Sequence, residues 1–439
     1  MSLRTYQRDA IARVQSAYRD GARAVCLQSP TGSGKSHAAI GGVIAPSVAR
    51  GRRPLFVAHL EEIIDDAAGR IASAGLSVGI VKSGRPSDPT AQVQVCSTQT
   101  LARMIERGDA LPSADRVILD EAHRAASSTN RAILGHYRDR GALILGLTAT
   151  PSRGDGQPLD EFERLVCGPS VKELIADGSL VRAEVFAPDR VLERGVARDP
   201  VELVLSERFG RRVVIFAPDG AAANDIHARL CAGGYAAETV LDGTPSEVRR
   251  GVRARIASGE TRGIVTVRAV IEGFDAPALD CAILCAAFTT IAPYLQAIGR
   301  VVRAHPGKVD AIVDDLRGAF YFHGPPDDDR AWSLDGAQGK SATEHPRGLR
   351  RCGACGLMCE PVTLCPHCGS TTITDPRPMR VQRAEMFAMS TVPVGARAMR
   401  YVEATERAMV ARGMRPEKAA IVARAKAPSW VREALNATG

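Results

Sequence analysis

The 439-residue sequence contains no run of about 18 apolar residues, which is the length that a membrane-spanning helix requires. Its first residues, MSLRTYQRDA, carry charges where a secretory signal peptide would have an apolar stretch. The sequence also contains no tandem repeat and no long low-complexity tract. We therefore expect neither a membrane protein nor a secreted one, and predict a protein that stays in the cytosol without a membrane partner.

The composition is that of a folded globular protein, with 45% apolar and 24% charged residues. A chain of this length is too long for one ordinary core and long enough for two α/β domains of roughly 150 residues each plus an appendage. The net charge of +8 suits a polyanionic partner. Residues 371–439 contain twelve Lys and Arg against six Asp and Glu, so this tail is the favoured electrostatic surface outside the main domains.

Short β-rich apolar runs alternate with longer helical stretches between Ala24 and Phe320, which is typical of parallel sheets with helices on both faces. The first set of predicted strands covers residues 24–29, 54–59, 93–98, 116–121 and 143–148. The second set covers residues 212–218, 236–242, 263–268, 281–287 and 311–315. The restart of the pattern predicts a first α/β domain over 1–180, a linker over 181–198, and a second α/β domain over 199–320. A stretch rich in Gly, Pro and Asp predicts another linker over 321–348.

A glycine-rich loop ending in a lysine follows the first predicted strand. The segment SPTGSGKS, Ser29 to Ser36, lies between that strand and a predicted helix, which is the context of a phosphate-binding loop. Gly32 and Gly34 allow successive N–H groups to point inward, beside the positive end of the helix dipole. Lys35 is then expected to contact the β and γ phosphates of ATP and Ser36 to bind Mg²⁺, with Thr31 and Ser33 completing the loop. An ordinary glycine-rich turn is the alternative.

Two adjacent carboxylates end the predicted strand RVILDEAH, at the sheet edge where α/β folds bind ligands. The two carboxylates of such a pair can have different roles: Asp120 would hold Mg²⁺, and Glu121 would orient or deprotonate the attacking water. His123 follows two residues later as a further catalytic candidate. In isolation, acidic residues after a strand are also common as helix caps.

The order of motifs resembles that of superfamily 2 helicases of the DEAH type. They are LRTYQ, SPTGSGKS, DEAH, LTATPSR (147–153), VIEGFDAPALD (270–280) and QAIGRVVR (296–303). The branch that the chain resembles most contains the XPB and UvsW repair helicases and the motor subunits of restriction enzymes. The resemblance covers roughly residues 1 to 320 and implies two tandem RecA-like domains with parallel sheets, with ATP and Mg²⁺ as cofactors.

The resemblance also implies roles for individual residues. It makes Gln7 the contact to adenine, and it makes Thr148 and Thr150 a coupling element whose hydroxyls could bond to the acidic pair. The nucleotide-binding set extends to Gly273, Asp275 and Gln296. Contacts to the nucleic-acid strand fall on His59, Thr98, Gln99, Thr100 and Thr266. The arginine usual in the family after the histidine is Leu60 here, so that one phosphate contact is not expected.

Arg300 and Arg303 lie three residues apart on a predicted helix, so both guanidinium groups can project from one face. We interpret them as arginine fingers, which stabilise the transferring phosphoryl group and can raise the rate by about 10³ to 10⁵. Because they come from the second domain, hydrolysis would depend on domain closure. Ala297 stands where many members of the family have another arginine, so one contact to the γ-phosphate, or one coupling contact, is not expected.

Five of the eleven cysteines lie within residues 352–368. Cys352, Cys355, Cys365 and Cys368 form two C-x2-C pairs that suit a tetrahedral, structural Zn²⁺ site. Cys359 and His367 are not expected to bind the metal. The pattern predicts a zinc ribbon over 349–373, followed by a basic helical tail over 374–439; either could contact a protein partner. The remaining cysteines are expected to be small buried hydrophobic residues: Cys26, Cys96, Cys167, Cys231, Cys281 and Cys285.

These observations predict an ATP-dependent helicase or translocase that acts on single-stranded, duplex or branched DNA, in repair, recombination or remodelling. The preference for DNA rests on the resemblance alone. An RNA helicase of the DEAH type remains open, as does the motor subunit of a restriction or defence complex, which would need a nuclease partner. An ATP-gated nucleic-acid clamp without hydrolysis is the non-enzymatic alternative.

Overall fold

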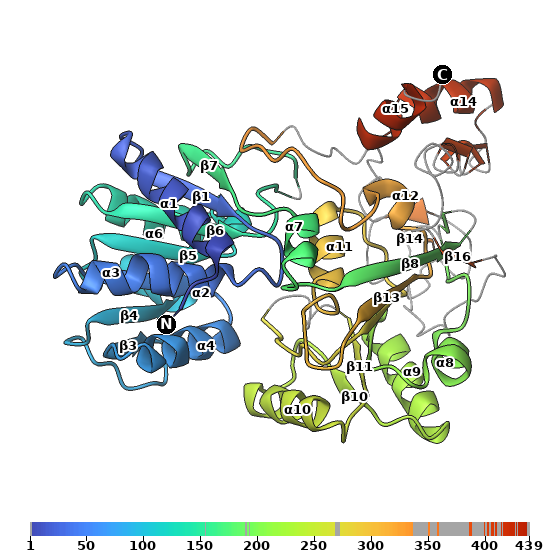
Figure 1. Cartoon of the computed structure of the whole chain (residues 1–439), viewed down its shortest axis with the longest axis horizontal. Helices are drawn as coiled ribbons and strands as arrows, with labels where there is room; N and C mark the ends of the chain where they lie inside the picture. The colour runs from blue at the N-terminus through green and yellow to red at the C-terminus, as the bar shows by residue number, and fades with distance from the viewer. Residues whose placement is uncertain are drawn as a thin grey trace.

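The computed structural model describes residues 2–153, 155–188, 191–192, 194–267 and 273–336, together with short pieces between 350 and 436. Two α/β domains lie side by side, the first in blue and cyan and the second in green to orange (Figure 1). Among the described residues, no helix is both long and apolar enough to cross a membrane.

The first domain is built on a seven-stranded parallel sheet in the order β3-β4-β2-β5-β6-β1-β7. Alternate residues of β1 enter two separate apolar clusters, Val25 and Leu27 on one face and Ala24 and Cys26 on the other. Burial on both faces explains why such strands are continuous apolar runs. The elements are α1 (Thr5–Arg19), β1 (Ala24–Gln28), α2 (Lys35–Ala39), η1 (Ile40–Ile44), α3 (Ala45–Val48), β2 (Pro54–Ala58), α4 (Glu61–Ser73), β3 (Val78–Val81), β4 (Val93–Ser97), α5 (Thr98–Arg107), β5 (Arg116–Asp120), η2 (Ala122–Arg124), α6 (Ser128–Arg138), β6 (Leu143–Thr148) and β7 (Arg164–Cys167).

The second domain has its own sheet in the order β10-β11-β9-β12-β13-β8-β16, parallel except for β16 at one edge. All ten strands predicted from the sequence are present, five in each sheet. The elements are α7 (Val171–Ala176), β8 (Arg182–Pro188), α8 (Pro200–Leu203), η3 (Val204–Arg208), β9 (Val213–Phe216), α9 (Gly220–Ala232), β10 (Ala237–Val240), α10 (Ser246–Ser258), β11 (Gly263–Thr266), β12 (Cys281–Leu284), α11 (Ile291–Ile298), β13 (Asp310–Asp315), α12 (Phe320–His323), β14 (Arg350–Arg351), β15 (Met358–Cys359), β16 (Met386–Ala388), α14 (Pro416–Ala425) and α15 (Ser429–Asn436).

The described parts of the two segments that composition predicted as linkers contain packed structure. Residues 182–188 form β8, which pairs with β13 inside the second sheet, so the linker prediction over 181–198 was wrong there. In the other segment, Tyr321 is fully buried and its hydroxyl donates to the carbonyl of Pro188 at 2.7 Å. Burial of this aromatic ring stabilises the packing of α12 (Phe320–His323) in the second domain.

Residues 325–336, which we call the return segment, run from the second domain back to the first. The backbone N–H of Leu159 donates to the carbonyl of Leu334 at 2.8 Å, and Lys172 pairs with Asp329 at 3.3 Å. Arg330 braces the segment by donating to the carbonyls of His323 and Pro325 at 2.9 and 2.7 Å. The chain therefore connects the two domains a second time.

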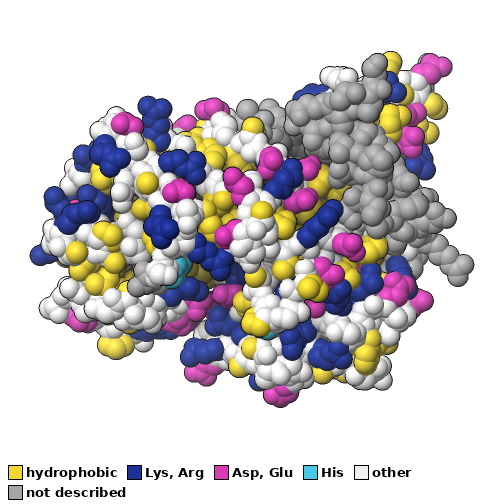
Figure 2. All heavy atoms as spheres, viewed as in Figure 1, with side chains coloured by type: hydrophobic (Ala, Val, Ile, Leu, Met, Phe, Trp, Pro, Cys, Tyr) yellow, Lys and Arg dark blue, Asp and Glu magenta, His cyan; other side chains and the backbone are white. Residues whose placement is uncertain are grey.

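Cysteine burial follows the prediction for Cys26, Cys96, Cys281 and Cys285, which are buried, whereas Cys167 is partly exposed and Cys231 is exposed. Cys231 lies on the outer face of α9, so its prediction was wrong. On the face drawn in Figure 2, Lys and Arg side chains are interspersed with Asp and Glu over both domains rather than gathered in one basic patch.

Candidate functional site

A cleft of about 530 Å³ lies between the two domains at the phosphate-binding loop. Most of the predicted nucleotide-site residues line it. From the first domain these are Gln7, Thr31, Gly32, Ser33, Gly34, Lys35, Ser36, Asp120 and Glu121, and from the second Gly273, Asp275, Arg300 and Arg303. Four of the predicted catalytic, nucleotide-binding and coupling residues lie outside the lining, namely His123, Thr148, Thr150 and Gln296.

The phosphate-binding loop joins β1 to the helix that begins at Lys35. Gly32 and Gly34 have φ angles of 90° and 75°, a region that glycine adopts without strain. The hydroxyl of Ser29 bonds to that of Ser33 at 2.6 Å, so the residue that departs from the usual pattern closes the loop from within. This backbone is a concave set of N–H groups with a lysine at the start of a helix, an arrangement suited to phosphate.

Asp120 ends β5 at the wall of the cleft and Glu121 follows it, and both are buried. Among the described residues, Glu121 is the single non-glycine residue with a positive φ, at 51°. Such backbone strain concentrates at functional sites, because the surrounding structure must hold the residue in place.

Burial, helped by the neighbouring Glu121 carboxylate, raises the pKa of Asp120 to about 6. Burial acts in the same direction on Glu121, but Lys35 and His123 outweigh it and hold the pKa of Glu121 below its usual value. The Oδ1 atom of Asp120 is buried without a hydrogen-bond partner among the described residues. Asp120 and Ser36 line the same cleft, and a carboxylate oxygen together with a hydroxyl fits the preference of Mg²⁺ for hard oxygen ligands.

His123 lies behind the acidic pair. Its Nδ1 is 3.3 Å from Oε2 of Glu121 and 3.5 Å from the hydroxyl of Thr148. The same hydroxyl also bonds to the backbone of Thr150, at 3.0 and 3.1 Å. Thr148 therefore reaches Glu121 through the imidazole, not by the direct bond to the carboxylates that the sequence suggested.

The second domain meets the phosphate-binding loop through the turn after α11. A methyl group placed on Gly299 would lie 2.4 Å from Cβ of Thr31, so the backbone of Gly299 is in close contact with the side chain of Thr31. Arg303 packs on Gly32, 3.2 Å from the position such a methyl group would take there, and forms an ion pair with Asp275. Arg300 is buried, donates to the carbonyl of Phe274 at 2.9 Å, and helps to lower the pKa of Glu121.

Gln296 and Gln7 differ from expectation in their contacts. Gln296 is buried on α11, and its Nε2 has no hydrogen-bond partner within the part of the chain that the structure describes. Gln7 donates to the carbonyls of Ser33 and Gly34 at 3.1 and 3.4 Å and accepts from the N–H of Arg4 at 3.0 Å. Gln7 thus braces the phosphate-binding loop, and its contact to adenine stays a prediction.

Sequence reasoning missed several residues of the cleft: Arg4, Tyr6, His37, Asp66 and Arg70. Tyr6 donates to the carbonyl of Ser33 at 3.0 Å and adjoins Gln7, so its position beside that motif could have identified it. Asp66 and Arg70 lie inside α4, where charged residues usually face solvent, and no local signal marked them.

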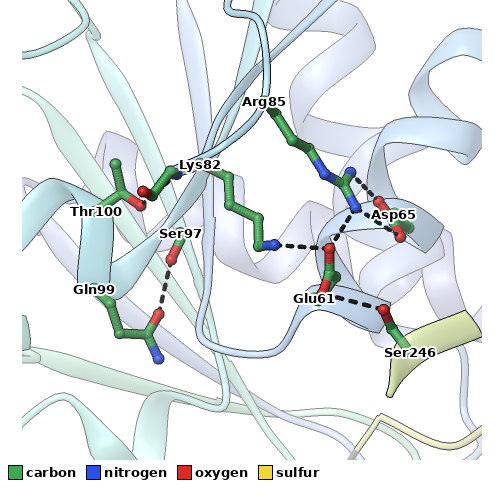
Figure 3. Close-up of polar contacts among 9 residues, drawn as sticks. Glu61, Asp65, Lys82, Arg85, Ser97, Gln99, Thr100 and Ser246 are labelled. Atoms are coloured by element: carbon green, nitrogen blue, oxygen red, sulfur yellow. Dashed lines mark hydrogen bonds and ion pairs between the residues drawn. The ribbon is translucent and has the colours of Figure 1, made fainter.

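Of the predicted strand-binding residues of the first domain, Gln99 and Thr100 lie at the start of α5, next to Ser97 at the end of β4 (Figure 3). Gln99 donates to the carbonyl of His59 at 3.1 Å and accepts from Ser97 at 2.7 Å. Thr98 is buried, and the hydroxyl of Thr100 accepts from the N–H of Ser83 at 3.2 Å. Thr266, from the second domain, is fully buried at the end of β11. Its hydroxyl is therefore not accessible to a strand in this conformation, contrary to expectation.

The four predicted zinc ligands, Cys352, Cys355, Cys365 and Cys368, lie outside the described residues. In the described ranges there is no group of three or more His, Cys, Asp or Glu side chains that could hold a metal ion together. The prediction of a zinc ribbon over 349–373 therefore rests on the sequence.

Comparison with known proteins finds two domain families in order along the chain. Residues 1–153 match the family described as type III restriction enzyme, res subunit, and residues 197–305 match the helicase conserved C-terminal domain. A 51.5 kDa protein of a Lactococcus phage (isolate 7-9) is 25% identical over 356 residues, which covers 76% of this chain and 74% of that protein.

A putative ATP-dependent helicase of Saccharomyces cerevisiae, IRC3, is also 25% identical over 356 residues, and the chain spans about half (52%) of its length. Among solved structures, a fragment of a putative HsdR subunit of a type I restriction enzyme from Vibrio vulnificus superposes with a TM-score of 0.57 at 20% identity, covering 76% of this chain and 66% of that one. That likeness shows the fold of two parallel-sheet domains. The two helicase domain families, in this order along the chain, indicate a superfamily 2 helicase related to the motors of type I and type III restriction enzymes, and they support an ATP-dependent nucleic-acid helicase.

Proposed function

We propose that this helicase is a DEAH-type motor that acts on DNA, as a helicase or translocase in repair, recombination or the remodelling of branched DNA. The observation that carries the proposal is the composite cleft, in which Lys35, Asp120 and Glu121 of one domain face Arg300 and Arg303 of the other. A site shared between two domains makes hydrolysis depend on how closely they approach.

The first domain binds the triphosphate of ATP. The N–H groups of the loop and the ammonium of Lys35 hold the β and γ phosphates, while Ser36 and Asp120 would hold Mg²⁺. The metal, when bound, neutralises phosphate charge. Asp120 must be ionised for this role, and its raised pKa makes the ionised form sensitive to pH.

Glu121 orients the attacking water and accepts its proton. Its lowered pKa keeps it ionised, so it is available as an acceptor at neutral pH. His123 holds Glu121 from behind and contacts Thr148. Through Thr148 and Thr150, a change at Glu121 can reach the end of β6, which supports a coupling role for this segment.

Arg300 and Arg303 supply positive charge to the transferring phosphoryl group from the second domain. ATP therefore favours the closed arrangement, and its hydrolysis removes the phosphate that the two domains share. Alternating closure would move the protein along a strand. Contacts to sugar and phosphate suit such movement, because a motor must pass over any sequence. We propose that these contacts come from His59, Thr98, Gln99 and Thr100 and, after a rearrangement, from Thr266.

Beyond the two domains, we propose that Cys352, Cys355, Cys365 and Cys368 bind one structural Zn²⁺, because four thiolates in two C-x2-C pairs match the spacing of such sites. The ribbon and the basic tail over 374–439 would add contacts to nucleic acid or to a protein partner.

The decisive experiment measures ATP turnover with single-stranded, duplex and forked DNA and with RNA, for the wild type and for Glu121→Gln. We expect stimulation by DNA with little dependence on sequence. Glu121→Gln should bind ATP but hydrolyse it at least about 10²-fold more slowly, since general-base contributions are of this size. Turnover that ignores every added nucleic acid would refute the motor. Stimulation by RNA alone would replace the DNA preference by the RNA-helicase alternative.

A second candidate is the motor subunit of a restriction complex, which the match of residues 1–153 to a restriction family favours. Such a subunit requires a nuclease partner. Strand separation or translocation by the purified chain alone would argue for the first candidate, whereas ATP turnover that needs a co-purifying nuclease would argue for the second.

A further inference from the structure

The side chains of α4 form a regular series of contacts with the second domain. Glu62 lies 3.4 Å from Arg249, Asp66 lies 3.8 Å from Arg253, and Arg70 lies 4.0 Å from Asp275. The three α4 residues are four positions apart, as are the two arginines of α10, so both sets lie on one face of their helix. We call these three pairs the α4 ladder.

Apolar and polar contacts flank the ladder at the amino-terminal end of α4. A methyl group on Gly273, whose φ is 73°, would lie 3.0 Å from Cδ1 of Leu60. Leu60 thus packs across the domain interface. Glu61 accepts a hydrogen bond from the hydroxyl of Ser246 at 3.2 Å. It also forms ion pairs with Lys82 and Arg85, at 2.7 and 2.6 Å (Figure 3). The start of α4 therefore contacts the second domain as well as the loop after β3.

The other end of the ladder reaches the ATP cleft. Arg70 and Asp66 line that cleft, and Asp275 pairs with both Arg70 and Arg303. Although burial acts to raise it, Arg303 and Arg300 hold the pKa of Asp275 below its usual value. The ladder thus ends on the carboxylate that orients one of the proposed arginine fingers.

The burial of the first pair indicates what the ladder does. The side chains of Glu62 and Arg249 are 10% and 11% exposed. At that burial the loss of hydration offsets most of the attraction, while a shift of register would leave a charge buried without its partner. Such a pair discriminates between positions of the two helices without fastening them permanently, as a reversible domain closure requires.

We infer that α4 is the docking helix of domain closure, and that Glu62, Asp66 and Arg70 are positioning residues that set where Arg300 and Arg303 enter the ATP cleft. The inference rests on the proposed motor function and extends it. The ion pairs of the α4 ladder, which extend over more than one helical turn, then couple domain closure to ATP hydrolysis.

The first test is Glu62→Ala, because Arg249 keeps its bonds to the carbonyls of Leu241, Asp242 and Thr244 and the second domain stays intact. We expect kcat for DNA-stimulated ATP hydrolysis to fall about tenfold or more, within the range typical of coupling between sites. The affinity for ATP, which the first domain supplies, should stay within about threefold. Arg255→Ala is the matched control, since Arg255 lies on the same helix but pairs with Glu238 inside the second domain; its kcat should stay near that of the wild type.

A charge exchange separates positioning from simple destabilisation. Asp66→Arg and Arg253→Asp should each lower kcat, and the double variant should recover to within a few-fold of the wild type. Recovery supports the ladder. A Glu62→Ala variant with wild-type kcat, or a double variant as slow as the singles while its thermal unfolding matches the wild type, overturns it. If the wild type itself shows no stimulated turnover, the proposed function fails instead.

Discussion

Gly299→Ala tests whether the closed arrangement is the one that hydrolyses ATP. Gly299 has φ −57° and ψ −15°, so alanine fits its backbone. The added methyl group would nevertheless lie 2.4 Å from Cβ of Thr31. Since carbon atoms in contact are about 3.5–4.0 Å apart, the two domains must separate by roughly 1 Å to admit it. A displacement of that size at a reacting centre costs about 10²-fold in rate.

We therefore expect Gly299→Ala to lower kcat for DNA-stimulated phosphate release by about 10²-fold, while each domain keeps its stability because opening relieves the clash. Thermal unfolding must be measured alongside, since the same methyl group lies 3.0 Å from the carbonyl of Leu295. Gly135→Ala on α6 is the control, because its methyl group would meet nothing within 4 Å. A folded Gly299→Ala protein that hydrolyses ATP within about threefold of the wild type would contradict the interdomain geometry, since a displacement of this kind cannot be that mild.

Three further results are expected. Arg300→Ala should lower kcat by about 10³-fold or more with ATP binding retained, as measured by phosphate release and nucleotide titration. Weaker ATP binding with an unchanged kcat would contradict the role of Arg300 as an arginine finger. The pKa of Asp120 is raised to about 6, so protonation of this carboxylate should weaken Mg²⁺ binding as pH falls below that value. At a fixed, limiting Mg²⁺ concentration, ATP turnover should fall by up to about tenfold per pH unit and recover when Mg²⁺ is added. Turnover that stays constant down to about pH 5 would contradict this expectation. Metal analysis of the reduced protein should give one zinc per chain, and Cys368→Ser should lower it; a value well under one for the wild type would exclude the ribbon.

The sequence predicted the central strands because parallel strands buried on both faces are unbroken apolar runs, as in β1 and β9. It missed β8, which begins with the exposed residues Arg182 and Glu184 and is buried mainly in its second half. The return segment was missed for a related reason. Its Gly, Pro and Asp residues suggest a linker, and its packing depends on contacts with residues far away in the sequence, such as the bond from the N–H of Leu159 to the carbonyl of Leu334.

Within the candidate site, local motifs identified the residues that bend the chain or end a strand, such as Gly34 and Asp120. They did not identify Asp66 or Arg70. A charged residue in a helix looks the same whether it faces water or another domain, and only the approach of α10 and Asp275 distinguishes the two. The indirect contact of Thr148 with Glu121 through His123 was likewise a matter of tertiary geometry.

The return segment limits how far the two domains can separate during a cycle of ATP hydrolysis. The chain crosses between the domains through residues 168–181 and again through residues 325–336, which bond to Leu159 of the first domain. Residues 168–181 are the covalent connection, and the hydrogen bond between Leu159 and Leu334 adds a non-covalent one, so opening that keeps this bond is limited to small rotations. The effective concentration of Arg300 and Arg303 at the phosphates therefore stays high between cycles, so each new ATP meets arginines that have moved only a short distance.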